Sequence, residues 1–164
     1  MPERNLSRQC KPCTACCQGW LRIETEVARA TLGAPCTHCT KTGCKIYEDR
    51  PVDPCQTFVC AWRKPDSPLA DWMRPDQCKA IVMFDRLVWR GQPAIVAVAV
   101  GARIPLRTVT WLQQYAQLHG QPLLLEEYEQ VQGKYTGRKR IAPMGNKEFE
   151  QEMMAGFRRG EMLW

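Results

Sequence analysis

Residues 10–17 read Cys-Lys-Pro-Cys-Thr-Ala-Cys-Cys, which places four thiols within eight positions. Five more cysteines follow between Cys36 and Cys60. Thiolates are soft ligands that bind zinc ions and iron–sulfur clusters tightly. The run contains a proline and is followed by Gly19, so it predicts a loop or tight turn rather than a regular element. We therefore expect the N-terminal part of the chain to fold around metal.

The 164 residues suffice for one domain of ordinary size. Nine of the ten cysteines lie between Cys10 and Cys60, and the tenth is Cys78. The distribution predicts a short lead-in over residues 1–9 and a cysteine-cluster region over residues 10–78. A small α+β region over residues 79–164 is expected to pack on it, so that the two form one compact unit.

The beginning of the chain is polar and cannot serve as an apolar signal core. The longest apolar run, Ala94 to Val100, is far shorter than the ~20 residues that span a bilayer. We therefore expect a soluble, cytoplasmic protein without a membrane partner. Thiols stay reduced in that compartment, so clustered cysteines favour metal or redox chemistry over disulfides.

The formal net charge of +6 counts every thiol as neutral. Residues 1–64 carry ten basic and six acidic side chains. Eight thiolates would turn that excess of four positive charges into four negative charges, which two divalent ions would neutralise. The sequence also contains a basic run at Lys134, Arg138, Lys139 and Arg140. We expect this run to be a solvated loop, and nucleic acid is not an expected partner.

The residues after the cysteines predict a small β-sheet with helices. Lys79–Trp89 and Ala94–Val100 are rich in β-formers and predict a hairpin. The other expected elements are a helix within 23–32, a helix from Thr108 or Thr110 to His119, a strand over Pro122–Tyr128, a loop over 133–145 and a last helix capped by Asn146. The fold class is therefore α+β, with two or three helices and a loop-rich cysteine region.

Cysteine spacing indicates metal ligands without choosing the metal. Tetrahedral zinc takes four ligands, often from turns with two residues between the cysteines. Three pairs have this spacing: Cys10/Cys13, Cys13/Cys16 and Cys36/Cys39. A C-x2-C-x2-C run also supplies three ligands to a cubane iron–sulfur cluster. Zinc and an iron–sulfur cluster therefore both stay open at this point.

The adjacent pair Cys16-Cys17 is the unusual element of the run. Neighbouring side chains diverge in most backbone conformations, so both rarely bind one ion. The pair could instead serve two metals, or one sulfur could bridge them. We treat a site with more than one metal as a hypothesis.

The run 10–17 is followed by Pro35-Cys36, Gly43-Cys44-x-Ile-Tyr-x2-Arg-Pro and Cys55-x2-Phe-x-Cys60. This order resembles the YkgJ-type cysteine cluster family, which is described as a zinc- or iron-chelating domain with eight shared cysteines. The resemblance covers roughly residues 10–62 and implies eight metal ligands. They are Cys10, Cys13, Cys16, Cys17, Cys36, Cys44, Cys55 and Cys60. Cys39 and Cys78 are additional to the family pattern.

The resemblance implies metal binding and leaves the biochemical role open. Zinc is preferred, because loop-rich regions are typical of structural zinc sites and zinc needs no assembly machinery. An iron–sulfur cluster is the close alternative. Some flagellin lysine methylases carry a similar cluster, so a redox or group-transfer enzyme is one alternative, and the sequence identifies no catalytic residue for it. A zinc-stabilised interaction module that presents the basic run is another.

Four further side chains have predicted roles beyond those of the family's shared cysteines. Cys39 is a further candidate ligand because of its spacing from Cys36, whereas Cys78 is expected to be a small buried hydrophobe. His38 is expected beside the ligands or at the surface rather than on the metal. Arg50 is expected to donate to loop carbonyls, the alternative being a contact with thiolate charge.

Overall fold

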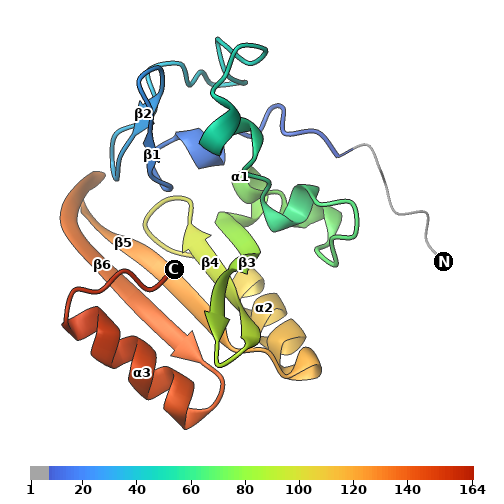
Figure 1. Ribbon diagram of the computed structural model, residues 1–164, viewed down its shortest axis with the longest axis vertical. Coiled ribbons are helices and arrows are strands. Elements are labelled where there is room, and N and C mark those ends of the chain that lie inside the picture. Colours follow the sequence, from blue (N-terminus) through green and yellow to red (C-terminus); the bar gives the residue numbers. More distant parts are fainter. Residues whose placement is uncertain (1–7) are drawn as a thin grey trace.

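The computed structural model describes residues 8–164 and has the predicted α+β class (Figure 1). The strands are β1 (Ile23–Glu24), β2 (Arg29–Ala30), β3 (Ala80–Trp89), β4 (Gln92–Ala99), β5 (Leu123–Val131) and β6 (Lys134–Met144). The helices are α1 (Pro75–Cys78), α2 (Leu106–His119) and α3 (Lys147–Arg158). Four single turns of helix complete the list: η1 (Ala15–Cys17), η2 (Val52–Gln56), η3 (Ala61–Arg63) and η4 (Asp71–Met73). No helix among residues 8–164 has the length and apolar character needed to cross a membrane.

The main sheet has four strands in the order β3-β4-β5-β6. The predicted hairpin is confirmed as β3 and β4, which pair antiparallel, and β5 and β6 form a second antiparallel hairpin. The central pair β4 and β5 is parallel, because α2 carries the chain back between them. The parallel ladder runs from Ile95 opposite Leu123 to Val98 opposite Glu126.

Both faces of the sheet are covered, which explains why residues 94–99 form an unbroken apolar run. On one face, Ile95 and Ala97 pack against Leu112 of α2 and against the segment 61–78. On the other face, Val96 and Val98 pack with Phe149 of α3 and with the cysteine region. Figure 1 shows α2 and α3 beside the sheet and the cysteine region at one end of it.

An aromatic contact joins the cysteine region to the sheet. The rings of Trp20 and Tyr128 stack with centroids 6.2 Å apart, and the Tyr128 hydroxyl donates to the Trp20 carbonyl at 3.3 Å. Gly33 approaches so closely that a Cβ placed there would lie 3.1 Å from the Cβ of Tyr135. The cysteine-rich loops therefore rest on β5 and β6.

The helix predicted within residues 23–32 is wrong, because this segment forms the short hairpin β1–β2. Thr25 explains the outcome. Its hydroxyl accepts from the Ala28 N–H at 2.8 Å, and its own N–H donates to the Ala28 carbonyl at 2.9 Å. A threonine side chain that bonds the nearby backbone favours a turn over a helix.

The loop predicted over residues 133–145 is also wrong, because residues 134–144 form the edge strand β6. Pairing with β5 along most of its length overrides the glycines and charges that suggested a loop. Lys139 and Arg140 form ion pairs with Glu126 and Glu127 at 2.9 Å and 3.6 Å. Charged side chains on an exposed edge strand also discourage pairing with another chain.

The two long helices begin at different kinds of residue. α2 starts at Leu106, directly after Pro105, rather than at the predicted threonine cap. Thr108 lies inside the helix, where its hydroxyl donates to the Cys78 carbonyl at 2.7 Å. The cap predicted for the last helix is confirmed, since Asn146 Oδ1 accepts from the Phe149 N–H at 2.9 Å.

Replacing Asn146 by alanine is expected to lower the free energy of unfolding by ~1 kcal/mol, because the Phe149 N–H loses its acceptor. In a chain of this size the melting temperature should fall by about 2–4 °C in thermal denaturation. Asn146→Ser retains a capping oxygen and should lose only a few tenths of that energy. An equal loss in both variants would show that the cap does not stabilise α3.

Candidate metal centre

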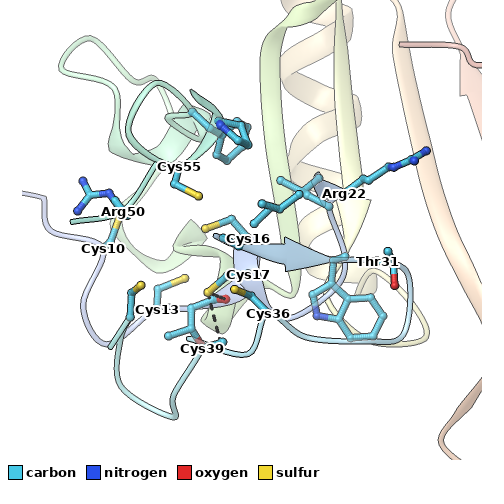
Figure 2. Close-up of a pocket in the computed structure, with 18 of the residues that line it drawn as sticks. Cys10, Cys13, Cys16, Cys17, Arg22, Thr31, Cys36, Cys39, Arg50 and Cys55 are labelled. Atoms are coloured by element: carbon cyan, nitrogen blue, oxygen red, sulfur yellow. Dashed lines mark hydrogen bonds between the residues drawn. The ribbon is translucent and has the colours of Figure 1, made fainter. Parts of the chain in front are cut away.

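A cavity of about 650 Å³ lies between the cysteine region and the sheet. Eight cysteines line it: Cys10, Cys13, Cys16, Cys17, Cys36, Cys39, Cys44 and Cys55. Figure 2 shows the labelled thiols coming from the first cysteine run, from the segment of Cys36 and Cys39, and from the segment of Cys55. Seven of the eight predicted ligands are therefore brought to one cavity, together with Cys39.

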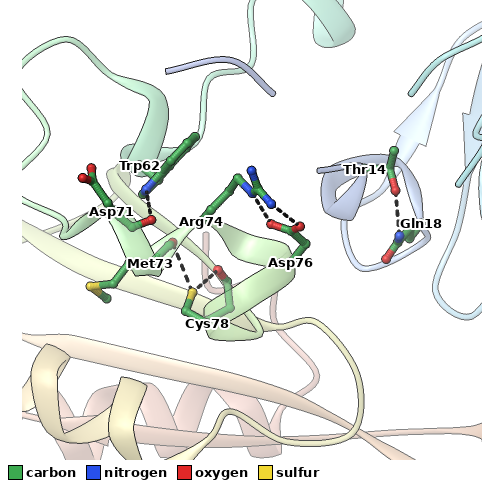
Figure 3. Close-up of polar contacts among 9 residues, drawn as sticks. Thr14, Gln18, Trp62, Asp71, Met73, Arg74, Asp76 and Cys78 are labelled. Atoms are coloured by element: carbon green, nitrogen blue, oxygen red, sulfur yellow. Dashed lines mark hydrogen bonds and ion pairs between the residues drawn. The ribbon is translucent and has the colours of Figure 1, made fainter. Parts of the chain in front are cut away.

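Two cysteines lie outside the wall of this cavity. Cys60 is half-buried where the cysteine region meets the sheet. Cys78 is 2% exposed in the core on the α2 face, and its Sγ lies 3.2 Å and 3.3 Å from the carbonyl oxygens of Met73 and Ala80 (Figure 3). Cys78 thus occupies the buried core position expected of it.

The first cysteine run is a tight turn followed by η1. The Cys13 N–H donates to the Cys10 carbonyl at 2.5 Å, and the Cys17 N–H donates to the Thr14 carbonyl at 3.0 Å. Buried Ala15 packs against the sheet, and Gln18 donates to the Thr14 hydroxyl at 2.7 Å (Figure 3). The small side chain of Ala15 lets the turn approach the sheet, and the thiols on either side of it reach the cavity.

The second cysteine group is tied to the first through the backbone. The Cys36 N–H donates to the Cys17 carbonyl at 2.9 Å, and the Cys39 N–H closes a turn on the Cys36 carbonyl at 2.9 Å. Cys39 and Cys44 face each other in an antiparallel bridge, so a small hairpin carries both thiols. These bonds hold Cys36 buried beside the first run.

A sulfur–sulfur contact in the cavity joins Cys17 and Cys39, whose Sγ atoms are 3.3 Å apart (Figure 2). In a tetrahedral zinc site with ~2.3 Å bonds, two sulfurs lie ~3.8 Å apart. This pair is therefore close enough to bind one ion. Among residues 8–164, no three Cys, His, Asp or Glu side chains already converge on one point at metal-binding distance.

Burial makes the thiolate form of several cysteines costly. It raises the pKa of Cys60 to about 12 and also raises the pKa values of Cys10, Cys13 and Cys55. The pKa of Cys17 is raised first by its contact with Cys16 and then by burial. Thiolates in these surroundings need positive charge close by.

Arg50 and His38 contact loop carbonyls at the edge of this cavity. Arg50 Nη1 donates to the Tyr47 carbonyl at 2.6 Å, and its guanidinium lies 3.8 Å from the Tyr47 ring centroid. His38 Nε2 lies 2.9 Å from the Val27 carbonyl, a distance that fits donation by the ring N–H. Both side chains also line the cavity, so Arg50 combines the predicted carbonyl contact with a position near the thiols.

Polar groups on the sheet side of the cavity were not predicted from the sequence. Glu126, Tyr128 and Lys139 line it together with Trp164. Glu126 is only 2% exposed, although it lies in an otherwise apolar part of β5. Burying a carboxylate inside an apolar strand is costly. The acidic residue in this apolar stretch is therefore the sequence signal that could have identified Glu126 as a site residue.

The donor chemistry of the cavity fits a soft metal. All ten cysteines are free thiols, and the eight in the wall can supply sulfur ligands from several segments. Carboxylates are few there, which makes calcium or magnesium a poor match. Comparison with family models, with curated proteins and with solved structures finds no match to this chain.

Proposed function

We propose that this chain is a metal-binding cysteine-cluster protein of the kind that the YkgJ-type resemblance implies. The observation that carries the proposal is one cavity lined by eight free thiols. Seven of these thiols belong to the set implied by the resemblance, and the eighth thiol in the cavity is Cys39. Cys60, the eighth cysteine of the resemblance, is half-buried where the cysteine region meets the sheet. Two zinc ions are the preferred cargo, and an iron–sulfur cluster is the alternative with the same ligands.

The segments that carry the thiols have little regular structure of their own. Between residues 8 and 60, the described elements are two-residue strands and short helical turns. Such a region gains stability when an ion draws several loops together, so metal binding contributes directly to folding. Cys17 and Cys39 are the natural starting pair, and Cys36 is the neighbouring ligand that the backbone holds beside them.

The test is anaerobic purification followed by elemental analysis and an absorption spectrum. Two zinc ions per chain in a colourless protein would support the preferred form. Iron with visible absorption would support the cluster. A fully reconstituted protein with one ion per chain would reject the two-metal arrangement, and one that retains no metal would reject the proposal.

Replacing Cys39 by serine is expected to weaken metal binding by at least ~10-fold, because the ion loses the thiol next to Cys17. The measurement is competition with a chromogenic chelator, with metal content per chain determined in parallel. His38→Ala is the matched control, since His38 is adjacent and lines the same cavity but bonds a carbonyl. If both variants bind metal like the wild type, Cys39 is not a ligand.

A second candidate function is a metal-dependent redox or group-transfer enzyme. The observation that favours it is the shared cavity, in which a buried carboxylate and a tyrosine face the thiol side. Catalysis by a metal requires an open coordination position. Cobalt-substituted protein whose spectrum changes on addition of azide would support this candidate, whereas an unchanged spectrum of a fully sulfur-ligated site would reject it.

A further inference from the structure

Glu126 is the most unusual side chain in the sheet. It points to the same face of β5 as Leu124 and Tyr128, because alternate residues of a strand share a face. Its side chain is 3% exposed. Removing a carboxylate from water costs several kcal/mol, so its hydrogen-bond partners decide whether it is tolerated.

The two carboxylate oxygens of Glu126 have different kinds of partner. Oε1 accepts from Lys139 Nζ at 2.9 Å and lies 3.4 Å from the Tyr128 hydroxyl. Both of these groups belong to the β5–β6 hairpin. Oε2 accepts from the indole N–H of Trp164 at 2.7 Å, and among residues 8–164 this is the side-chain donor that reaches it. One oxygen is thus held by the sheet and the other by the C-terminal tail.

The tail is attached mainly through side chains. α3 ends at Arg158, and the last backbone hydrogen bond along residues 8–164 runs from the Glu161 N–H to the Gly156 carbonyl. Met162, Leu163 and Trp164 all line the cavity, but Met162 is 86% exposed, whereas Leu163 and Trp164 are half-buried. The Trp164 indole can therefore leave Glu126 without breaking any backbone hydrogen bond of the sheet or of α3.

We infer that Glu126 is the anchor of a small-molecule binding site, and that Trp164 occupies this site as an internal substitute for the ligand. The indole indicates the ligand class: a flat, mostly apolar molecule with one N–H donor at its edge. An N–H bond to a buried carboxylate is a strong, charge-assisted interaction. The ligand would replace the indole and donate to the same Oε2 atom.

The surroundings of Glu126 fit such a ligand. The cavity volume of about 650 Å³ lies within the range of small-molecule sites. Trp20, Leu21 and Phe58 provide apolar wall, and Glu126 supplies the directed polar group. Glu126 also lies at the end of the parallel ladder between β4 and β5, where it pairs with Val98.

The inference goes beyond metal binding and does not require it. The same cavity is lined by the thiols, so a molecule bound at Glu126 would share this space with any metal held there. This arrangement gives the chain a place for a substrate or regulator next to its metal centre.

The test uses Trp164→Ala, which removes the internal indole, and two probes of nearly the same shape. Indole carries the N–H donor, and benzothiophene lacks it. In calorimetric titrations, Trp164→Ala should bind indole at least ~10-fold more tightly than benzothiophene, the range expected for a hydrogen bond to a charged group. It should also bind indole at least ~10-fold more tightly than the wild type does, because Trp164 competes in the wild type.

Two further variants separate this site from general loosening of the tail. Trp164→Phe keeps the ring but cannot donate to Glu126, so it should bind indole more tightly than the wild type. Leu163→Ala removes a neighbouring apolar contact but keeps the indole, and it should bind like the wild type. Equal affinity for the two probes, or no indole binding by a Trp164→Ala protein with wild-type circular dichroism, would overturn the inference.

Metal content measured in the same samples keeps the two proposals apart. Indole binding by Trp164→Ala protein, together with wild-type protein that retains no metal, would leave this site standing and reject the metal centre. Full metal content without any preference for indole would support the metal centre and reject the small-molecule site at Glu126.

Discussion

Cys13→Ser is expected to remove metal from the protein and to unfold the cysteine region. Cys13 lines the cavity from the middle of the first run and is half-buried against the sheet face. Loss of a supporting group near a metal typically costs 10–100-fold in affinity, and loss of a ligand should cost more. The measurements are metal per chain and near-ultraviolet circular dichroism, in which the stacked Trp20 and Tyr128 report on the region.

Cys78→Ser is the matched control for this prediction. Its thiol is buried on the other face of the sheet, beside the carbonyls of Met73 and Ala80, and a serine hydroxyl can donate to either. Metal content should therefore remain at the wild-type level. Metal loss in Cys78→Ser equal to that in Cys13→Ser would refute the ligand assignment. Cys60→Ser should resemble Cys13→Ser, because the resemblance includes Cys60 among the ligands.

A chelator separates a missing ligand from a general folding defect. Treating the wild-type protein with excess chelator should reproduce the spectrum of Cys13→Ser, because binding and folding of this region are coupled. The sheet should persist, since the core on its α2 face is built mainly from aliphatic side chains of β3, β4, β5 and α2. A chelated protein that keeps the wild-type spectrum while it loses all metal would show that the loops fold without metal.

Gly19→Ala is expected to destabilise the protein by about 3–5 kcal/mol and to lower its melting temperature by roughly 10 °C. Gly19 has φ of +96°, which is unfavourable for a residue with a side chain. A Cβ at this position would lie 2.7 Å from the Thr31 carbonyl oxygen and 2.9 Å from that of Ala34. Those two residues form a backbone bridge with hydrogen bonds of 3.1 Å and 2.8 Å, so the clash would force the loops beside the cavity apart.

Gly101→Ala provides the control for backbone conformation. Gly101 has φ of +108°, and a Cβ there would meet no atom within 4 Å. It should therefore cost only the ~1–2 kcal/mol of the conformation itself and leave metal content unchanged. Thermal denaturation of the two variants isolates the effect of the clash. Equal losses of stability would contradict a packing role for Gly19.

The local patterns of residues 79–99 and 146–158 were sufficient to predict their structure. The apolar run 94–99 predicted a buried strand, and it is buried because both faces of the sheet are covered. The helix cap at Asn146 was predictable, because the Phe149 N–H that donates to the Asn146 side chain lies only three residues away. Secondary structure that is stabilised by residues a few positions apart can therefore be predicted from the sequence.

Residues 134–144 show why other predictions were wrong. Their glycines and charges resemble those of a loop, but pairing with β5 makes them a strand. The charge of Lys139 is balanced by Glu126, thirteen positions earlier in the chain. A strand whose stability comes from its neighbour carries only a weak signal in its own composition.

The α+β class, the hairpin of β3 and β4, the cap of α3 and the set of candidate thiols were all predictable from the residues, since each of these depends on local pattern or residue chemistry. The tertiary structure alone decided which thiols share a cavity, that Cys39 lies beside Cys17, and that Glu126 and Trp164 meet across it. Glu126 and Trp164 are 38 positions apart, and the Trp20 and Tyr128 that join the two regions are 108 apart. Contacts over such separations form when buried faces of distant segments pack together. Local sequence patterns do not show which distant residues will meet.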